Sequence, residues 1–280
     1  MFIDIHVHPA FYDPINGDEA VEEMRHSALD IHKNGTAPLE HIFNQMRCAG
    51  LDRLCLLPED YTTELGRPVV TNEEVKALVD LAPDKFIGFA SVDPFLPDAA
   101  QRLEHAFGDL GLKGLKLHPS RQHFYPCDER LNAVYDVCEA YKKPIIFHSG
   151  LSWEPNTLTK YSRPTEFEEL AATRPGLKIC LAHFGWPWAT ETAMLCLKYP
   201  NVYTDTAIVP MDSPEVFFRH IFTREWGPTW FEHNFADKVM YGSDSPRNHT
   251  HGIEKLEMRP DTRAKLMGGN AIKWLGMEVK

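Results

Sequence analysis

The six cysteines of this 280-residue chain do not form any of the common cysteine-based motifs. No two of them make a C-x-x-C pair, so the sequence spells out neither a thiolate zinc site nor a dithiol redox site. We therefore expect buried free thiols in a reducing compartment. The residues concerned are Cys48, Cys55, Cys127, Cys138, Cys180 and Cys196.

Long apolar runs and clustered positive charge are also missing. No stretch approaches the roughly 18 apolar residues that span a bilayer, and the first residues do not have the pattern of a secretory signal. The 29 basic residues are scattered, and 40 acidic residues outnumber them, which leaves a formal charge of −11. Such a charge repels phosphate backbones and anionic lipid. We expect a cytoplasmic protein that binds neither nucleic acid nor a membrane.

The sequence has no glycine-rich phosphate loop, no internal repeat and no sign of a second domain. With 43% hydrophobic and 25% charged residues, its composition is that of an ordinary globular protein. A length of 280 residues suits one large α/β domain. We expect residues 1–280 to form a single domain.

Short apolar runs that end in polar residues return at intervals of very roughly 30 residues. Because most of these runs are almost continuously apolar, they are typical of strands that helices cover on both faces of a parallel sheet. The eight runs are Phe2–His8, Asp52–Pro58, Lys85–Asp93, Leu112–His118, Pro144–His148, Leu177–His183, Val202–Thr206 and Lys238–Asp244.

Helix signals lie between the runs. Residues 71–74 have the form of a capping box, Pro38 and Pro97 stand where helices could begin, and Asp128–Ala140 has apolar residues at helical spacing. Eight strands that alternate with helices predict an α/β fold, a closed (β/α)8 TIM barrel. An open doubly wound sheet is the alternative, and the missing phosphate loop disfavours it.

Two segments exceed what a minimal barrel needs. Residues 9–35 follow the first strand and predict an insertion, a loop plus a short helix over the mouth of the barrel. Residues 206–235 are rich in aromatic side chains, which could line a substrate pocket or pack together in a subdomain or dimer surface. We favour packing. The aromatic residues are Phe217, Phe218, Phe222, Trp226, Trp230, Phe231 and Phe235.

Histidines and one aspartate recur at the ends of the predicted strands. His6 and His8 are two residues apart, so both lie on one face of the first strand with Asp4 below them. One histidine near a strand end is usually only a hydrogen-bonded polar residue. Five of 14 histidines at strand exits are harder to ascribe to coincidence, because these ends meet at the mouth of a barrel. The later residues of this set are His118, His148, His183 and Asp244. Imidazoles and carboxylates that converge in this way suit a divalent cation.

Five phrases of the sequence, taken in order, resemble the amidohydrolase superfamily, in its amidohydrolase-related branch of metal-dependent hydrolases and decarboxylases. The resemblance spans nearly the whole chain. The phrases are IDIHVHP (residues 3–9), GLKLHP (114–119), IIFHSG (145–150), LAHFG (181–185) and YGSDSP (241–246).

The resemblance implies a catalytic metal and indicates which residues would bind it. His6, His8, His148 and Asp244 are similar to the ligands of one divalent metal, Zn²⁺ in the first place and Mn²⁺ as an alternative. His183 is similar to the residue that contacts the metal-bound water or the substrate. A bound cation lowers the pKa of water towards 7. In this scheme Asp244 also takes a proton from the water, and His183 protonates the leaving group or holds the substrate oxygen.

Two features depart from the simplest pattern. Some relatives hold two metals bridged by a carboxylated lysine, and Lys116 shares a strand face with His118. We favour one metal, with Lys116 unmodified and available to a substrate carboxylate. Some decarboxylating relatives have glutamate where this chain has His6, which favours hydrolysis slightly.

Basic and aromatic residues that follow the strands suggest a small, anionic organic substrate, since guanidinium groups pair with carboxylates and indoles contact flat rings. The candidate substrate contacts are Lys116, His118, Arg121, Trp153, Arg163, Trp186 and Arg247. We expect a hydrolase that uses a metal-bound water to attack an ester, lactone or amide carbonyl. A metal-dependent decarboxylase of an unsaturated or aromatic acid is the first alternative, and a non-catalytic binding barrel is the second. Relatives are commonly homo-oligomers, which this sequence leaves open.

Overall fold

The structure, a computed structural model, describes residues 1–29, 35–154, 156–208, 210–211, 213–244 and 250–278. Within these residues nine short strands run parallel to their neighbours. They are β1 (Ile3–Val7), β2 (Arg53–Leu56), β3 (Phe86–Gly88), β4 (Ala90–Ser91), β5 (Leu115–Leu117), β6 (Ile145–Phe147), β7 (Ile179–Leu181), β8 (Val202–Asp205) and β9 (Val239–Met240).

The strands form a ring in chain order. Strands β1 to β3 make one ladder and β4 to β9 another. The two ladders meet at Phe89, whose N–H donates to the Leu56 carbonyl at 3.0 Å. The other junction is closed by the Ile5 N–H, which donates to Tyr241 O at 3.0 Å, and by the Asp244 N–H, which donates to His6 O at 2.8 Å. Each of the eight predicted runs contains a strand, with the third run split into β3 and β4, and the prediction of a TIM barrel is confirmed.

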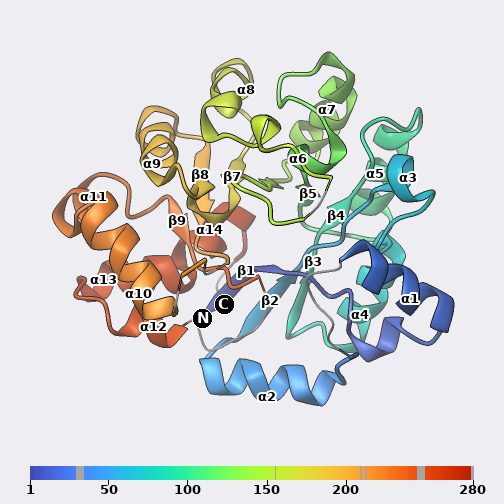
Figure 1. The fold of residues 1–280 in the computed structure, drawn as a ribbon, viewed down its shortest axis with the longest axis horizontal. Helices are drawn as coiled ribbons and strands as arrows, with labels where there is room; N and C mark the ends of the chain where they lie inside the picture. The colour runs from blue at the N-terminus through green and yellow to red at the C-terminus, as the bar shows by residue number, and fades with distance from the viewer. Residues whose placement is uncertain (30–34, 155, 209, 212, 245–249, 279–280) are drawn as a thin grey trace.

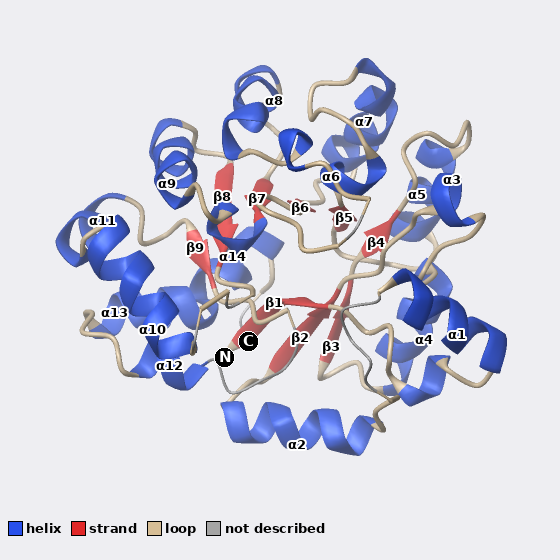
Figure 2. Ribbon diagram, viewed as in Figure 1, coloured by secondary structure: helices blue, strands red, loops and turns tan. Residues whose placement is uncertain are grey.

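Helices surround the ring of strands on its outside (Figures 1 and 2). The α-helices are α1 (Glu19–Ala28), α2 (Leu39–Ala49), α3 (Thr62–Leu65), α4 (Asn72–Leu81), α5 (Ala99–Gly108), α6 (Pro119–Gln122), α7 (Asn132–Ala140), α8 (Glu168–Thr173), α9 (Ala189–Lys198), α10 (Pro214–Arg219), α11 (Pro228–Asn234), α12 (Thr250–Glu254), α13 (Pro260–Ala264) and α14 (Asn270–Leu275). Short 3₁₀ segments are η1 (Asp13–Ile15), η2 (Glu129–Leu131), η3 (Thr159–Tyr161), η4 (Pro164–Phe167) and η5 (Ala182–Gly185), and π-helical segments are η6 (His220–Glu225) and η7 (Lys265–Gly269).

The predicted helix starts agree with the structure. Thr71 caps α4 in a capping box with Glu74, and Pro38 immediately precedes α2. Helix α5 starts two residues after Pro97. The capping box of α4 satisfies backbone N–H groups that have no partner inside the helix, whereas α2 and α5 start without a side-chain cap.

Two apolar clusters hold the barrel together. The larger lies between strands and outer helices. The smaller includes Ile146, Cys180 and Met240 from the strands and the α14 residues Ala271 and Trp274. The Trp274 ring lies 6.2 Å from the Phe89 ring, centroid to centroid, so the last helix packs against the strands.

The insertion after β1 contains η1 and α1, as the sequence predicts. Buried Arg25 anchors α1 through Nε to Val69 O at 2.8 Å and through Nη2 to Glu74 at 2.7 Å. At the end of α1, the Ala28 carbonyl accepts from Arg121 Nη1 at 2.9 Å. The insertion therefore reaches the corner that follows β5. The predicted insertion, residues 9–35, also includes residues 30–34, which lie outside the described residues.

The aromatic residues of 206–235 pack together, as we favoured. Around Phe184 the rings of Phe217, Phe222 and Trp226 lie with centroids 5.8, 5.6 and 5.2 Å away. Helices α10 and α11 and segment η6 bring them there, and all but Trp230 of the seven aromatics are buried. The cluster supports η5, which carries Phe184 beside His183.

All six cysteines are free, and four are buried. The expectation of burial is wrong for Cys48, which is exposed, and for Cys127, which is half-buried. Cys48 lies on α2, whose buried residues are Ile42, Met46 and Ala49, so its side chain falls on the solvent side of the helix. Among the described helices, none is long and apolar enough to cross a membrane.

Candidate active site

His6 of β1, His8 directly after this strand and the aspartate after β9 converge at one end of the barrel. The Nε2 atoms of His6 and His8 lie 3.2 Å apart. Oδ1 of Asp244 is 3.3 Å from His6 Nε2 and 3.7 Å from His8 Nε2. The period of two in β1 and the β1–β9 junction bring these atoms together, and they form a group suited to a metal ion.

Asp205, at the end of β8, holds His6 in position. Its Oδ2 lies 2.9 Å from His6 Nδ1, and its Oδ1 accepts from the N–H groups of His183 at 2.8 Å and Ala207 at 3.0 Å. With Asp205 ionised, Nδ1 of His6 is the donor and Nε2 carries the lone pair. Such a carboxylate–histidine pair fixes the tautomer that a metal ligand needs.

The backbone around the site is strained at two strand ends. His183, Phe184 and Asp244 have φ angles of 63°, 55° and 71°, in the left-handed region that non-glycine residues rarely adopt. Strain of this kind persists only where the surrounding structure enforces it, and it concentrates at functional sites. Here the buried Phe184 ring enforces it on one side of the mouth.

One ring nitrogen of His148 and one of His183 are buried and unsatisfied in hydrogen bonding among the described residues. Nε2 of His148 and Nδ1 of His183 have no hydrogen-bond partner among the described residues. The His183 ring lies 4.8 Å from the His6 ring and 4.9 Å from the His148 ring, centroid to centroid. His148 is outside both groups of ligand atoms that lie within 4.8 Å of one another, which are His6, His8 and Asp244, and His6, His183 and Asp205.

Burial keeps the imidazoles of His6, His148 and His183 neutral. Desolvation, with Lys116 nearby, lowers the pKa of His6 well below its usual value, and burial does the same for His148 and, less strongly, for His183. Burial opposes ionisation of Asp244, yet its neighbours, His6 first, hold its pKa below the usual range. Neutral imidazoles and an ionised carboxylate are the states that bind a divalent cation.

Lys116 of β5 is buried and points into the same centre. Its Nζ lies 3.2 Å from His6 Nε2, and burial lowers its pKa. Lys116, which the sequence suggests as a substrate contact, therefore lies beside the histidine of β1.

The remaining candidate substrate contacts are dispersed. His118 stacks on His148 with centroids 3.9 Å apart and 5° between the ring planes. The Trp153 and Trp186 rings lie nearly parallel at 6.1 Å. Arg163 is half-exposed and pairs with Glu191 at 2.6 Å, with no contact to the histidine cluster among the described residues. Arg247 lies outside the described residues.

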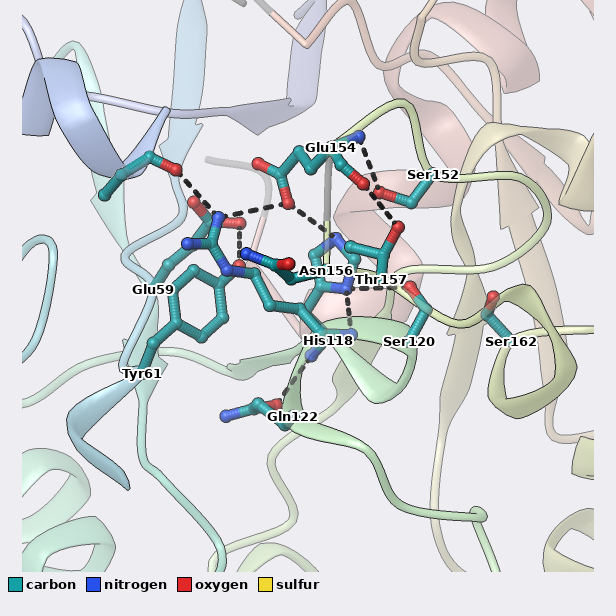
Figure 3. Close-up of polar contacts among 12 residues, drawn as sticks. Glu59, Tyr61, His118, Ser120, Gln122, Ser152, Glu154, Asn156, Thr157 and Ser162 are labelled. Carbon is teal, nitrogen blue, oxygen red and sulfur yellow. Dashed lines mark hydrogen bonds and ion pairs between the residues drawn. The ribbon is translucent and has the colours of Figure 1, made fainter. Parts of the chain in front are cut away.

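Arg121 belongs to a buried network beside His118. Figure 3 labels Glu59, Tyr61 and Glu154 of this network. Its guanidinium contacts Glu64 through Nε at 3.0 Å and Glu154 through Nη1 at 3.2 Å, and lies 4.3 Å from the Tyr61 ring centroid. Tyr61 donates to Glu59 at 2.7 Å, and Glu59 is 3.9 Å from His8 Nδ1. The network thus extends to His8.

Sequence reasoning missed Asp205, Glu59 and Glu154. The first two had a usable signal, because Asp205 lies one residue before the end of the predicted strand Val202–Thr206 and Glu59 directly follows the predicted strand Asp52–Pro58. Glu154 had none, since it lies in the loop that follows β6, and only the folded chain brings it to His118.

A family model of amidohydrolases matches residues 3–277. The chain belongs to this family. It is part of the amidohydrolase superfamily, as the strand-end phrases indicated, and its relatives in that family are enzymes. One curated protein, fluG of Emericella nidulans, is 36% identical over 72 residues. That match covers 25% of this chain and 8% of the length of the fungal protein.

Solved structures share the fold over nearly the whole chain. An uncharacterised TIM-barrel protein of Bordetella bronchiseptica has a TM-score of 0.74 at 20% identity, over 98% of each chain. A 4-oxalomesaconate hydratase of Rhodopseudomonas palustris has 0.68 at 17%, over 99% of this chain and 96% of the other. A 5-carboxyvanillate decarboxylase of Novosphingobium aromaticivorans, solved with manganese and a nitrobenzoic acid, has 0.69 at 14%, over 99% and 97%.

Proposed function

We propose that this amidohydrolase is a metal-dependent hydrolase that cleaves an ester, lactone or amide bond of a small organic substrate. One observation carries the proposal: the ionised Asp244 carboxylate lies against both strand β1 histidines and is still partly open at the mouth of the barrel, with 30% of its side chain exposed. A carboxylate in this position can meet a water molecule and a substrate from the open side.

The residues present fit one divalent cation. His6, His8 and Asp244 would hold it, together with His148, whose Nε2 is buried without a partner among the described residues. Imidazole and carboxylate ligands suit Zn²⁺ or Mn²⁺. When bound there, the cation would polarise a carbonyl oxygen and make water more acidic. We assign Lys116 to orientation of the substrate rather than to a second metal.

In the proposed reaction, residues of the protein accept and donate the protons. Water adds to the carbonyl carbon as Asp244 accepts one of its protons, and the bond to the leaving oxygen or nitrogen breaks as that atom takes up a proton. Asp244 can pass the proton it has accepted to that atom, and His183, whose ring is neutral, can hold the substrate oxygen with one N–H, because its Nδ1 has no partner among the described residues. Lys116, 3.2 Å from His6, fixes the substrate oxygen by its charge.

Two other functions are separable by experiment. Decarboxylation would use the same cluster without adding water, and the similarity to decarboxylases and to a hydratase, at 14–17% identity, shows only a shared fold. A binding barrel without chemistry would leave unexplained why ionised and neutral groups are held in strained backbone at one centre.

Labelled water distinguishes hydrolysis from decarboxylation. We expect zinc- or manganese-loaded protein, screened against lactones, esters and amides, to place one ¹⁸O atom from H₂¹⁸O in the new carboxylate at each turnover. Mass spectrometry of the product measures it. Release of CO₂ from unsaturated or aromatic acids, without label in the remaining product, would select the lyase instead.

Asp244→Asn tests the proton-transfer role. The amide keeps an oxygen towards the metal but cannot accept a proton, so we expect kcat to fall by about 10²- to 10⁴-fold while bound metal, measured by elemental analysis, falls much less. A control is Asp109→Asn, an exposed aspartate that pairs with His105 on the outer surface. Metal content and kcat both unchanged in Asp244→Asn would contradict the assignment.

A further inference from the structure

Two hydrogen-bond donors in the segment that follows β5, one from Arg121 and one from His118, are directed towards the same position. Arg121 is buried, and two of its nitrogens are already directed: Nε to Glu64 at 3.0 Å and Nη1 to the Ala28 carbonyl at 2.9 Å. Nη1 is also 3.2 Å from Glu154 Oε2. The same oxygen lies 3.8 Å from Nε2 of His118.

The hydrogen bonds of His118 fix where its proton is. The backbone N–H of Arg121 donates to His118 Nδ1 at 3.3 Å, so Nδ1 bears the lone pair. Burial, reinforced by Lys116 and Arg121, lowers the pKa of His118 well below its usual value, so the ring is neutral. The proton is therefore on Nε2, which faces Glu154 as a donor. A guanidinium N–H and an imidazole N–H that converge make a receptor for a carboxylate.

Glu154 comes to this receptor from a separate part of the chain. It lies in the loop after β6 and extends its carboxylate towards His118 (Figure 3). Its backbone contacts are local, with Ser152 at 3.5 Å and Thr157 at 2.7 Å. Its Oε2 is buried yet forms no hydrogen bond of good geometry with the described residues. The carboxylate is present at the receptor but fits it poorly.

The charges around Glu154 also weaken its binding to Arg121 and His118. Burial and the carboxylate of Glu59 raise its pKa to about 7, Arg121 opposes the rise, and Asp244 adds to it. Two other titratable groups lie beside it. His118 is neutral and contributes only its N–H. Burial raises the pKa of Tyr61 well above its usual value, so the Tyr61 hydroxyl is uncharged as well. Three carboxylates, those of Glu59, Glu64 and Glu154, thus stand around one guanidinium.

We propose that Arg121 Nη1 and His118 Nε2 form a binding subsite for a carboxylate of the substrate, and that Glu154 occupies this subsite until such a carboxylate displaces it. The substrate class is then a small ester, lactone or amide that also bears a free carboxylate. This inference rests on the proposed function for the reaction but concerns binding alone.

Benzoate is a suitable probe, and uncharged benzamide is its control. Binding to metal-loaded protein is measured by titration calorimetry. If Glu154 fills the subsite about nine-tenths of the time, its removal tightens an anion's apparent affinity about tenfold. We expect Glu154→Ala to tighten benzoate by that factor and to leave benzamide unchanged. Glu64→Ala removes the same charge from the same guanidinium without emptying the subsite, so it should tighten benzoate much less.

Two further measurements keep the proposal open to refutation. For the wild type, benzoate should bind more tightly as the pH falls from 8 to 6, because Glu154 loses its charge, and Glu154→Ala should lack this slope. In the double variant Glu154→Ala/Arg121→Lys, the tighter binding of benzoate should disappear. A thermal melt checks that this variant is folded. Equal effects of Glu154→Ala and Glu64→Ala, or no tightening in either, would overturn the subsite.

The outcome separates the subsite from the reaction. If Glu154→Ala binds benzoate more tightly but the protein hydrolyses no carboxylate-bearing ester, the subsite is supported and the proposed function is wrong. Hydrolysis of neutral esters, with no effect of Glu154→Ala on benzoate, would leave the function standing and remove the subsite.

Discussion

At the scale of single residues, the orientation of His6 depends on Asp205. A carboxylate that holds a ligand histidine usually contributes 10- to 100-fold to metal affinity. Asp205→Asn keeps an acceptor for the His183 and Ala207 N–H groups but loses the charge opposite His6 Nδ1. We expect zinc affinity, measured by competition with a chromogenic chelator, to fall by about 10- to 100-fold.

A neighbouring substitution controls for a general loss of stability. Thr204, also in β8, donates a buried hydrogen bond to Leu181 O, and its hydroxyl bonds to none of the proposed ligands among the described residues. Thr204→Val should cost about 1 kcal/mol of unfolding free energy and leave zinc affinity as it is. Should both variants lose zinc equally, Asp205 would have only a structural role.

The site could be predicted at this scale wherever a residue follows a strand in the sequence. His6, His8, His183 and Asp244 meet because parallel strands all end at one mouth. Glu154 could not be predicted, since a loop conformation and not a strand register brings it to His118. Exposure also decides whether a candidate residue can belong to the site. The Arg163 guanidinium could bind a substrate carboxylate, and Arg163 follows a strand in the sequence. In the structure, however, it pairs with Glu191 on the surface.

At the scale of elements, the junction of β1 with the segment after β9 depends on Asp4. Its carboxylate accepts from the His6 N–H at 3.0 Å, the Ser243 N–H at 3.0 Å and the Ser243 hydroxyl. Burial nevertheless raises its pKa to about 8. The unfolded chain loses this proton near pH 4, so the contribution of Asp4 to stability is complete below that pH and is lost as the pH rises towards 8.

Asp4→Asn removes this titration and keeps the shape. We expect its unfolding free energy, from urea titrations, to increase relative to the wild type between pH 5 and pH 8, by at most about 1.4 kcal/mol per pH unit. Asp52→Asn is the matched control, because exposed Asp52 bonds the other end of β1 through the Phe2 N–H. A pH-independent difference in Asp4→Asn would show that Asp4 is ionised in the fold.

The aromatic helices of residues 214–235 have a role beyond stability. Phe222 packs on Phe184 at 5.6 Å, and Phe184 follows His183 in the strained segment η5. Phe222→Ala should cost about 3–5 kcal/mol in urea unfolding and also lower kcat, because η5 loses its support. Phe107→Ala, a buried residue of α5, should cost a similar amount with kcat unchanged in the folded protein. An equal kcat in both variants would exclude a supporting role.

At the scale of the whole molecule, the alternation of apolar runs and helix signals predicted the barrel, because strands covered on both faces must be apolar throughout. The break at Phe89 and the short length of β9 were not predictable, since they depend on how the ring closes. The sequence predicts a short helix over the mouth but not the contacts that hold this helix in place. The Ala28–Arg121 hydrogen bond, which ties the insertion to the corner after β5, exists only in the folded chain.

Metal binding should stabilise the entire barrel. The proposed ligands come from β1, from the end of β6 and from the segment after β9, so the unfolded chain cannot bring them together. A ligand at 100 times its Kd stabilises the fold by about 2.7 kcal/mol, which for a chain of this size raises Tm by about 5–10 °C. Chelation should therefore lower Tm by that amount, and zinc should restore it. His6→Ala should abolish the shift, whereas His105→Ala, on the outer surface, should keep it. A shift that survives in His6→Ala would place the stabilising metal elsewhere.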